Sequence, residues 1–288
     1  MPQSIEQTFQ QLVKELTPEH GVGEAQSLAR LLFEDLLSWR RGQRDRELAP
    51  EEEERLQTAV TRLQEGEPLQ YITGRADFFG LALHVTPAVL IPRPETEELV
   101  EWVLEYRRAF PSEPVLLDIG TGSGCIPLAL KDRWPQAQVY GLDVSEAALA
   151  VAKSNAENLE LSVDWLLANI LNKEEWLSLP AVHILISNPP YIPHSEANLM
   201  PELVKRHEPD LALFVENDEP LIFYEKIMQL ALQRLKPNGL LFFECNEFNA
   251  EQVHELGKQL GFINAELRKD LQGKWRMWKG HRPQASDG

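Results

Sequence analysis

From Val115 onward, short apolar segments alternate along the chain with longer segments of helical periodicity. This alternation, with strands that are apolar on both faces, indicates a parallel sheet covered by helices. The expected strands are Val115–Ile119, Gln138–Leu142, Val163–Ala168, Val182–Ser187 and Leu240–Cys245. The expected helices are Cys125–Arg133, Glu146–Asn158, Leu221–Leu235 and Ala250–Leu260. With Phe262–Leu267 and an antiparallel closing strand at Lys274–Lys279, the pattern predicts a doubly wound, mostly parallel α/β sheet of about seven strands.

The first 66 residues show only helical patterns. Two apolar stripes at helical spacing predict one helix through residues 5–16 and a second through residues 25–36. A third helix is expected to begin at Pro50, because the missing N–H of proline costs nothing in a first turn. The acidic run Glu51–Glu54 then suits the positive end of the helix dipole.

Between these two patterns, the segment 69–94 has a different character. Asp77–Val85 combines aromatic and β-branched residues around a glycine, which predicts a hairpin. Pro92 and Pro94 then enforce an extended path before a helix opens at Glu95. We therefore expect a helical domain at 1–68, a hairpin linker at 69–94, the α/β domain at 95–280 and a polar tail at 281–288.

Composition restricts the partners and the setting. The chain has 45 Asp and Glu against 28 Lys and Arg, a net charge of −17, which disfavours a partner bound through its phosphates. No apolar run approaches the ~20 residues of a membrane span, and the first residues lack the layout of a signal peptide. Two cysteines 120 residues apart favour a reducing cytoplasm, and seven scattered histidines predict no metal site. We expect a monomer.

The first ligand signal is the loop Asp118-Ile119-Gly120-Thr121-Gly122-Ser123-Gly124, between the first strand and its helix. Glycines at this place let the backbone turn tightly and approach a ligand closely. Because Cys125 stands where a dinucleotide fingerprint needs glycine, the spacing favours S-adenosylmethionine. That ligand has no pyrophosphate, so its amino-acid part is expected to lie over the loop. The alternative interpretation is a purely structural turn.

Three residues that follow the next strands complete the expected cofactor site. Asp143 ends the second strand, 25 residues beyond Asp118, where a carboxylate can accept both ribose hydroxyls; the alternative is a helix cap. Asn169 ends the third strand, where a side chain is expected to meet the adenine amino group, although an asparagine there is also a common turn residue. Ile170 is expected to pack on the adenine face.

The sharpest motif is Asn188-Pro189-Pro190-Tyr191, directly after the buried strand Val182–Ser187. Ligands of a doubly wound sheet lie at the carboxyl ends of the strands, at the switch point, which here falls between the first and fourth strands. The two prolines stiffen the loop and offer carbonyls without N–H donors. The Asn188 side-chain oxygen and the Pro189 carbonyl therefore form an acceptor pair for an –NH2 group, beside both cofactor and substrate, and Tyr191 offers a flat face to its planar carrier.

This arrangement suits methyl transfer to an amide nitrogen. Such a nitrogen is a poor nucleophile because its lone pair is delocalised. Two acceptors that pull on its hydrogens turn the lone pair towards an already activated methyl group, so positioning supplies much of the acceleration. No nucleophilic side chain is required, and Cys125, Cys245 and His183 are interpreted as core residues.

At this point the chain resembles the bacterial N(5)-glutamine methyltransferases that modify peptide chain release factors. The resemblance covers nearly the whole chain and rests on the glycine loop, Asp143, Gly66–Gly74, Leu90–Glu97, Asn188–Tyr191 and Glu208-Pro209. It implies the class I methyltransferase fold, S-adenosylmethionine as cofactor, and methylation of the glutamine in a Gly-Gly-Gln loop, with the helical domain helping to dock the protein substrate. The chain departs from the family at Asn169, usually aspartate, and at Ile170, often aromatic.

Three other functions stay open at this level. Asn-Pro-Pro-Tyr is shared with DNA adenine methyltransferases, so an adenine amino group is one alternative, which would need base extrusion and a basic surface. A second is a glutamine of a ribosomal protein. A third is a catalytically silent adaptor that binds S-adenosylmethionine, although such a binder does not need the acceptor pair at 188–191.

Overall fold

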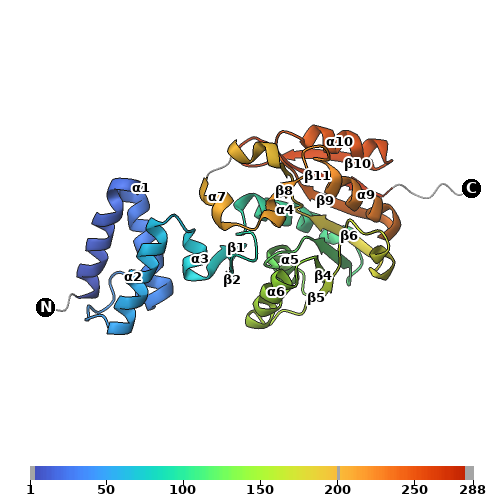
Figure 1. The fold of residues 1–288 in the computed structure, drawn as a ribbon. Helices are drawn as coiled ribbons and strands as arrows, with labels where there is room; N and C mark the ends of the chain where they lie inside the picture. The colour runs from blue at the N-terminus through green and yellow to red at the C-terminus, as the bar shows by residue number, and fades with distance from the viewer. Residues whose placement is uncertain (1–3, 200–201, 283–288) are drawn as a thin grey trace, which may run out of the picture. The chain divides into compact units, whose positions relative to one another are not determined.

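The computed structural model describes residues 4–199 and 202–282. The chain divides into two compact units, one ending at Arg75 and one beginning at Ala76 (Figure 1). The finer limits that we expect at residues 68, 94 and 280 remain predictions. The end of the expected polar tail, 283–288, lies outside the described residues.

The first unit is helical, as predicted. Its helices are α1 (Ile5–Leu37), α2 (Pro50–Gln64) and the short α3 (Leu69–Thr73), which we did not predict. The two expected helices at 5–16 and 25–36 are the arms of α1, which bends where Gly21 adopts φ 73° and ψ 163°. A left-handed φ suits glycine, and it interrupts the helical path there. Both arms pack their apolar stripes into one core with α2.

The second unit is built on one seven-stranded sheet of order β10-β11-β9-β6-β3-β4-β5. The strands are β3 (Val115–Ile119), β4 (Gln138–Asp143), β5 (Asp164–Leu167), β6 (Val182–Ser187), β9 (Leu235–Glu244), β10 (Ile263–Lys269) and β11 (Trp275–His281). The five strands β5, β4, β3, β6 and β9 pair in parallel, and β11 pairs antiparallel with β9 and with β10. This confirms the predicted doubly wound fold and its antiparallel closing strand.

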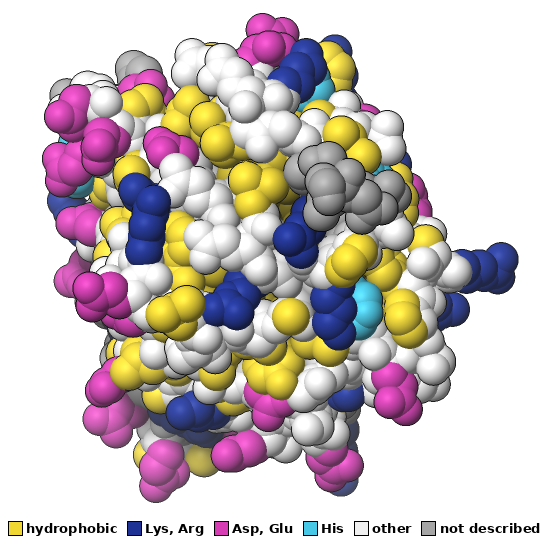
Figure 2. Space-filling view, turned by 90° about the vertical axis from the view of Figure 1, so that its right-hand side faces the viewer, with side chains coloured by type: hydrophobic (Ala, Val, Ile, Leu, Met, Phe, Trp, Pro, Cys, Tyr) yellow, Lys and Arg dark blue, Asp and Glu magenta, His cyan; other side chains and the backbone are white. Residues whose placement is uncertain are grey.

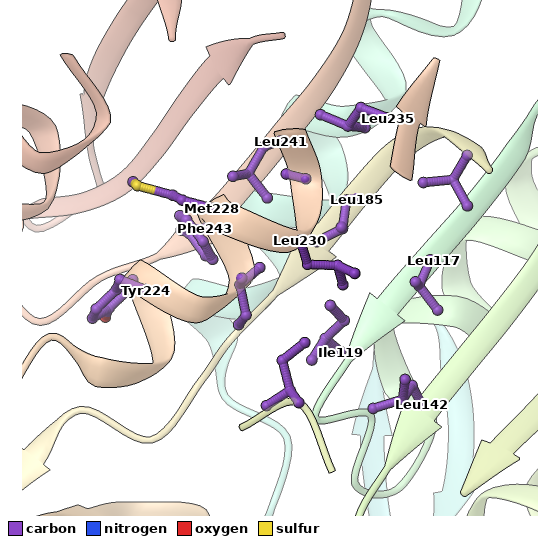
Figure 3. Close-up of a cluster of buried hydrophobic side chains, with 14 of the residues drawn as sticks. Leu117, Ile119, Leu142, Leu185, Tyr224, Met228, Leu230, Leu235, Leu241 and Phe243 are labelled. Atoms are coloured by element: carbon purple, nitrogen blue, oxygen red, sulfur yellow. The ribbon is translucent and has the colours of Figure 1, made fainter. Parts of the chain in front are cut away.

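Helices cover both faces of the sheet. The longer ones are α4 (Pro94–Glu105), α5 (Cys125–Arg133), α6 (Glu146–Asn158), α9 (Ile222–Arg234) and α10 (Ala250–Gln259). Successive strand residues enter different layers: Leu240 and Phe242 of β9 pack in the layer of α4 and α5, and Leu241 and Phe243 in that of α9 and α10. Figure 3 shows this second layer, in which Tyr224, Met228 and Leu230 of α9 pack over the strands. The residues on both faces of these strands are apolar because helices cover both faces of the sheet.

Shorter elements lie in the connections. The predicted hairpin is β1 (Arg75–Phe78) with β2 (Leu81–His84). A two-stranded parallel pair that we did not predict joins β7 (Ile192–Pro193) to β8 (Phe214–Val215). The other short elements are η1 (Arg107–Ala109), η2 (Glu175–Ser178), η3 (His194–Leu199), α7 (Glu202–His207) and α8 (Asp210–Leu213). None of the helices in the described part of the chain combines the length and apolarity of a membrane span.

One buried asparagine ties the hairpin to the loop that follows β3. Asn155 of α6 accepts a hydrogen bond from the His84 N–H at 2.7 Å and donates its amide to the carbonyls of His84 and Ser123, each at 2.9 Å. Three of the hydrogen-bonding positions of the amide are therefore used in a side chain that is 1% exposed. These hydrogen bonds hold the end of β2 close to the glycine loop.

The contact between α10 and β11 is close because Gly257 has no side chain. A Cβ placed on Gly257 would lie 2.4 Å from Cζ2 of Trp278, which is fully buried. We expect Gly257→Ala to lower the free energy of unfolding by about 1–2 kcal/mol, because overpacking against a rigid ring outweighs the gain in helix propensity. Thermal or urea unfolding measures this, with Gln259→Ala on the exposed side of the same helix as the control. A Gly257→Ala protein as stable as that control would show that the two elements separate freely.

Candidate active site

A cavity of about 380 Å³ opens at the carboxyl ends of β3, β4 and β6. Its walls include the loop after β3, the start of α6, the residues after β5, the loop after β6, and residues 88–90 ahead of α4. Eight of the predicted site residues line it: Gly120, Gly122, Asp143, Asn169, Ile170, Asn188, Pro189 and Pro190. The strand order thus brings together residues that lie up to 70 positions apart in the sequence.

The glycine loop is held on the end of β4. The N–H groups of Gly120 and Thr121 donate to the carbonyl of Leu142 at 2.8 and 3.0 Å. Gly120 and Gly122 have φ values of 74° and 54°, and a Cβ at either would meet no atom within 4 Å, so their open side faces free space. Gly124 differs, because a Cβ there would lie 2.9 Å from the ring of Trp165. Its absence of a side chain serves the close packing of α5.

Asp143 joins the glycine loop to α6. Its Oδ2 accepts from the Gly122 N–H and its Oδ1 from the Ser145 N–H, each at 2.9 Å. The capping role is therefore present, although Ser145 is itself the N-cap through its bond from Ala148. Each carboxylate oxygen keeps a further lone pair, and Asp143 lines the cavity, so the same side chain can also accept from ligand hydroxyls.

Below the loop lie buried polar atoms without partners. Neither carboxylate oxygen of Asp118 makes a regular hydrogen bond within the described residues, and the same holds for the hydroxyls of Thr121 and Ser123. Burial raises the pKa of Asp118 to about 7, although the nearby Thr121 hydroxyl acts in the opposite sense. Unpaired buried polar groups are costly and are typical of ligand sites. Asp118, Thr121 and Ser123 are each 1–3% exposed, and none of them is among the residues that line the cavity. The sequence motif contained Asp118, but we did not single it out.

The residues after β5 form a tight turn. The Asn169 Oδ1 accepts from the Leu171 N–H at 2.9 Å, and the Asn169 N–H donates to Glu175 at 2.7 Å. This is the turn role weighed above for an asparagine at this position. Ile170 is buried and lines the cavity beside it. Contacts of both residues with adenine remain predictions.

The Asn188–Tyr191 motif stands between two cavities. A second cavity of about 210 Å³ is lined by Asn188 and Tyr191 together with Leu90, Arg93, Ile192, Ala212 and Leu213. Asn188 therefore forms part of the wall of both cavities. Pro189 is buried, and no described residue donates a hydrogen bond to its carbonyl oxygen. Tyr191 is half-buried, and burial raises the pKa of its hydroxyl far above the ordinary value.

Two further polar residues adjoin Asn188. Its Nδ2 lies 3.3 Å from the Thr96 Oγ1, and the Thr96 hydroxyl donates to the Glu244 Oε2 at 2.6 Å. Burial raises the pKa of Glu244 to about 7. We did not predict either role. Thr96 lies inside the family segment Leu90–Glu97, and Glu244 ends a buried strand at the edge where ligands bind. The sequence could therefore have pointed to both residues as site candidates.

An ion pair adjoins the second cavity, because Arg93 is one of its lining residues. The Arg93 Nη2 lies 2.6 and 2.7 Å from the two oxygens of Glu208, whose side chain is almost fully buried. Burial raises the pKa of Glu208, and the charge of Arg93 opposes that rise. The pair joins the start of α4 to the segment Pro209–Leu213, which lines both cavities. The Glu208-Pro209 motif therefore has a structural role here.

The remaining candidates lie elsewhere. His183 accepts from the Val115 N–H at 2.9 Å through Nδ1, which fits the interpretation as a satisfied structural histidine. Cys245 is buried, while Cys125 is only partly so, and both are free thiols. In residues 4–199 and 202–282, no group of three or more His, Cys, Asp and Glu side chains could hold a metal ion.

Comparison with known proteins agrees with this geometry. Residues 7–74 match the family described as the PrmC N-terminal domain, and residues 103–212 match the methyltransferase small domain. The release factor glutamine methyltransferase of Flavobacterium psychrophilum is 43% identical over 225 residues, covering 77% of this chain and 78% of that protein. That of Bacteroides thetaiotaomicron is 39% identical over 227 residues, covering 79% of this chain and 80% of its own.

Solved structures add the fold. The hMettl16 catalytic domain, solved in complex with MAT2A 3'UTR hairpin 6, superposes with a TM-score of 0.56 at 18% identity, covering 85% of this chain and 86% of that one. At this identity the likeness concerns the methyltransferase fold alone. The sequence relatives, the two matched domains and the cavity at the switch point agree with one another. The chain belongs to the release factor glutamine methyltransferases, a family of S-adenosylmethionine-dependent enzymes.

Proposed function

We propose that this protein transfers a methyl group from S-adenosylmethionine to the side-chain amide nitrogen of the glutamine in the Gly-Gly-Gln loop of peptide chain release factors. The observation that carries the proposal is the position of Asn188, which borders both cavities. A side chain at that boundary can contact the methyl donor on one side and the methyl acceptor on the other.

The larger cavity is the proposed cofactor site. Gly120 and Gly122 offer open backbone to the amino-acid part, Asp143 offers carboxylate oxygens to the ribose, and Asn169 and Ile170 border the place for adenine. When bound, S-adenosylmethionine supplies a methyl group that its sulfonium already activates. The protein therefore needs to position and desolvate the acceptor rather than to provide a nucleophile.

The smaller cavity is the proposed place for the glutamine side chain. The Asn188 Oδ1 and the Pro189 carbonyl accept the two hydrogens of its –NH2 group, and the Tyr191 ring supports its planar amide. The single charged group of the described wall, Arg93, is already paired with Glu208. A wall with no unpaired charge favours a neutral acceptor such as an amide.

A protein substrate is preferred over a nucleic acid. The net charge of −17 opposes binding through phosphates. On the face drawn in Figure 2, Lys and Arg side chains are scattered among hydrophobic and uncharged surface instead of forming one patch. We further propose that the helical unit helps to dock the release factor, that the enzyme acts as a monomer, and that it works in the reducing cytoplasm that its two free cysteines favour.

Asp143→Ala tests the ribose role. Each lost charge-assisted hydrogen bond should weaken cofactor binding by about 1.5–3 kcal/mol, or about 10- to 150-fold in Kd. Calorimetric titration with S-adenosylhomocysteine measures this directly. Asp164→Ala, an exposed aspartate at the far end of β5, is the matched control and should bind normally. Equal affinity in the two variants would rule out a ribose contact by Asp143.

Asn188→Ala tests the acceptor role. The change leaves a substrate N–H unsatisfied and frees the amide to rotate, and misplacement by ~1 Å can cost about 100-fold in rate. We expect methyl transfer to a release factor at saturating substrate to be lost, while the Kd for S-adenosylhomocysteine stays close to that of the unchanged protein. Asn158→Ala, exposed at the end of α6, is the control. Wild-type turnover in the Asn188→Ala protein would sink the proposal.

A further inference from the structure

Three residues from separate parts of the chain form a buried relay behind the acceptor loop. Asn188 follows β6, Thr96 lies in the first turn of α4, and Glu244 ends β9. Thr96 and Glu244 are each 2% exposed. The contacts run from the Asn188 Nδ2 to the Thr96 Oγ1 at 3.3 Å and from the Thr96 hydroxyl to the Glu244 Oε2 at 2.6 Å.

The chemistry of the relay gives it a direction. An ionised carboxylate only accepts hydrogen bonds, so the single hydroxyl hydrogen of Thr96 must point to Glu244. The Thr96 oxygen is then left with lone pairs only, and it can receive only the –NH2 end of the Asn188 amide. The Asn188 Oδ1 consequently points away from Thr96. While Glu244 is ionised, these hydrogen bonds fix the orientation of the Asn188 amide.

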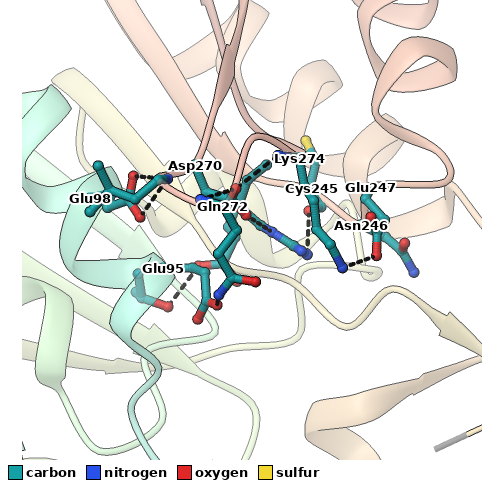
Figure 4. A network of polar contacts seen from close by, with 12 residues as sticks. Glu95, Glu98, Cys245, Asn246, Glu247, Asp270, Gln272 and Lys274 are labelled. Carbon is teal, nitrogen blue, oxygen red and sulfur yellow. Dashed lines mark hydrogen bonds and ion pairs between the residues drawn. The ribbon is translucent and has the colours of Figure 1, made fainter.

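A residue of the β10–β11 hairpin favours the ionised form of Glu244. The Arg276 guanidinium of β11 lowers the pKa of Glu244 against the rise that burial causes. Arg276 is itself held by the Asp270 Oδ2 at 3.2 Å. The turn between β10 and β11 is fastened to α4, since Glu98 accepts from the Leu271 N–H at 3.2 Å and Gln272 donates to Glu95 at 3.2 Å (Figure 4).

We propose that Thr96 and Glu244 are positioning residues that hold the Asn188 amide with its oxygen turned towards the substrate –NH2 group. The inference deepens the proposed function and depends on it. Protonated Glu244 would donate to the Thr96 oxygen, and the freed Thr96 hydrogen would then favour the opposite Asn188 orientation, with –NH2 facing –NH2. The turnover number should therefore be high while Glu244 is ionised and fall as the pH drops through its pKa of about 7.

Other groups around Glu244 must be separated from its effect. Those that interact with its charge are Arg93 and Glu95 at the start of α4, Arg276 of β11, Tyr191, Tyr224, Cys125 and Cys245. Asp118, whose pKa burial also raises to about 7, is a second source of pH dependence in this range. Glu244→Gln separates the two, because the neutral isostere cannot titrate while Asp118 still can. The fall in kcat near pH 7 should be smaller in Glu244→Gln than in the unchanged protein, and an identical kcat profile in the two proteins would overturn the role of Glu244.

Thr96→Val tests the relay itself. The isosteric change removes the hydroxyl and frees Asn188, so kcat on a release factor should fall by up to about 100-fold. The Kd for S-adenosylhomocysteine should not change, and Thr96→Ser, which keeps the hydroxyl, should restore most of the turnover. Thermal unfolding confirms that both variants are folded. Equal losses in the valine and serine variants would reduce Thr96 to a packing residue and overturn the inference.

Asn188→Ala in the same assay keeps the two proposals distinguishable. If Asn188→Ala is inactive and Thr96→Val has wild-type kcat, the relay is refuted while the acceptor role stands. If Asn188→Ala itself keeps wild-type turnover, the proposed function fails first, and the relay fails with it.

Discussion

The pairing of β3 with β6 is the constraint on which the site depends. The two strands run in parallel with Ile119 opposite Ser187, and the buried Ser187 hydroxyl donates to the Ile119 carbonyl at 2.7 Å. Both strands therefore end at the same edge of the sheet, where β3 is followed by the glycine loop and β6 by Asn188. The helices on the two sides of β3 and β6 must diverge there, which leaves the crevice that an open α/β sheet offers to its ligands.

Near this edge of the sheet the protein buries carboxyl groups, although burial disfavours their ionised form. Asp118 near the end of β3 and Glu244 at the end of β9 are both carboxyls whose pKa values burial raises to about 7. Burying such groups costs free energy that an apolar core would not lose, so their presence needs a compensating role. The Thr96 hydroxyl and Arg276 supply part of the compensation for Glu244. The arrangement suits a site that positions an acceptor, since rigid polar contacts preserve an orientation that solvent would scramble.

The local patterns of the sequence predicted much of this. Periodicity located the central strands and the helical first unit, and the glycine loop, Asp143 and Asn188 do converge on one cavity. Periodicity did not predict which residues pair over long distances along the chain. Thr96 and Glu244 are 148 positions apart, and Arg93 and Glu208 are 115 apart. No periodic pattern reports which buried side chains meet across a sheet. The sequence also did not reveal that Gly124 gives space to Trp165.

Peptide mapping of the product is the most direct test of the central claim. A release factor is incubated with this protein and methyl-labelled S-adenosylmethionine, digested with trypsin and sequenced by mass spectrometry. The account predicts a single added methyl group on the side-chain amide of the glutamine in the Gly-Gly-Gln loop. Label on another residue of the release factor, or label found only on a ribosomal protein or a nucleic acid offered in parallel, would contradict it.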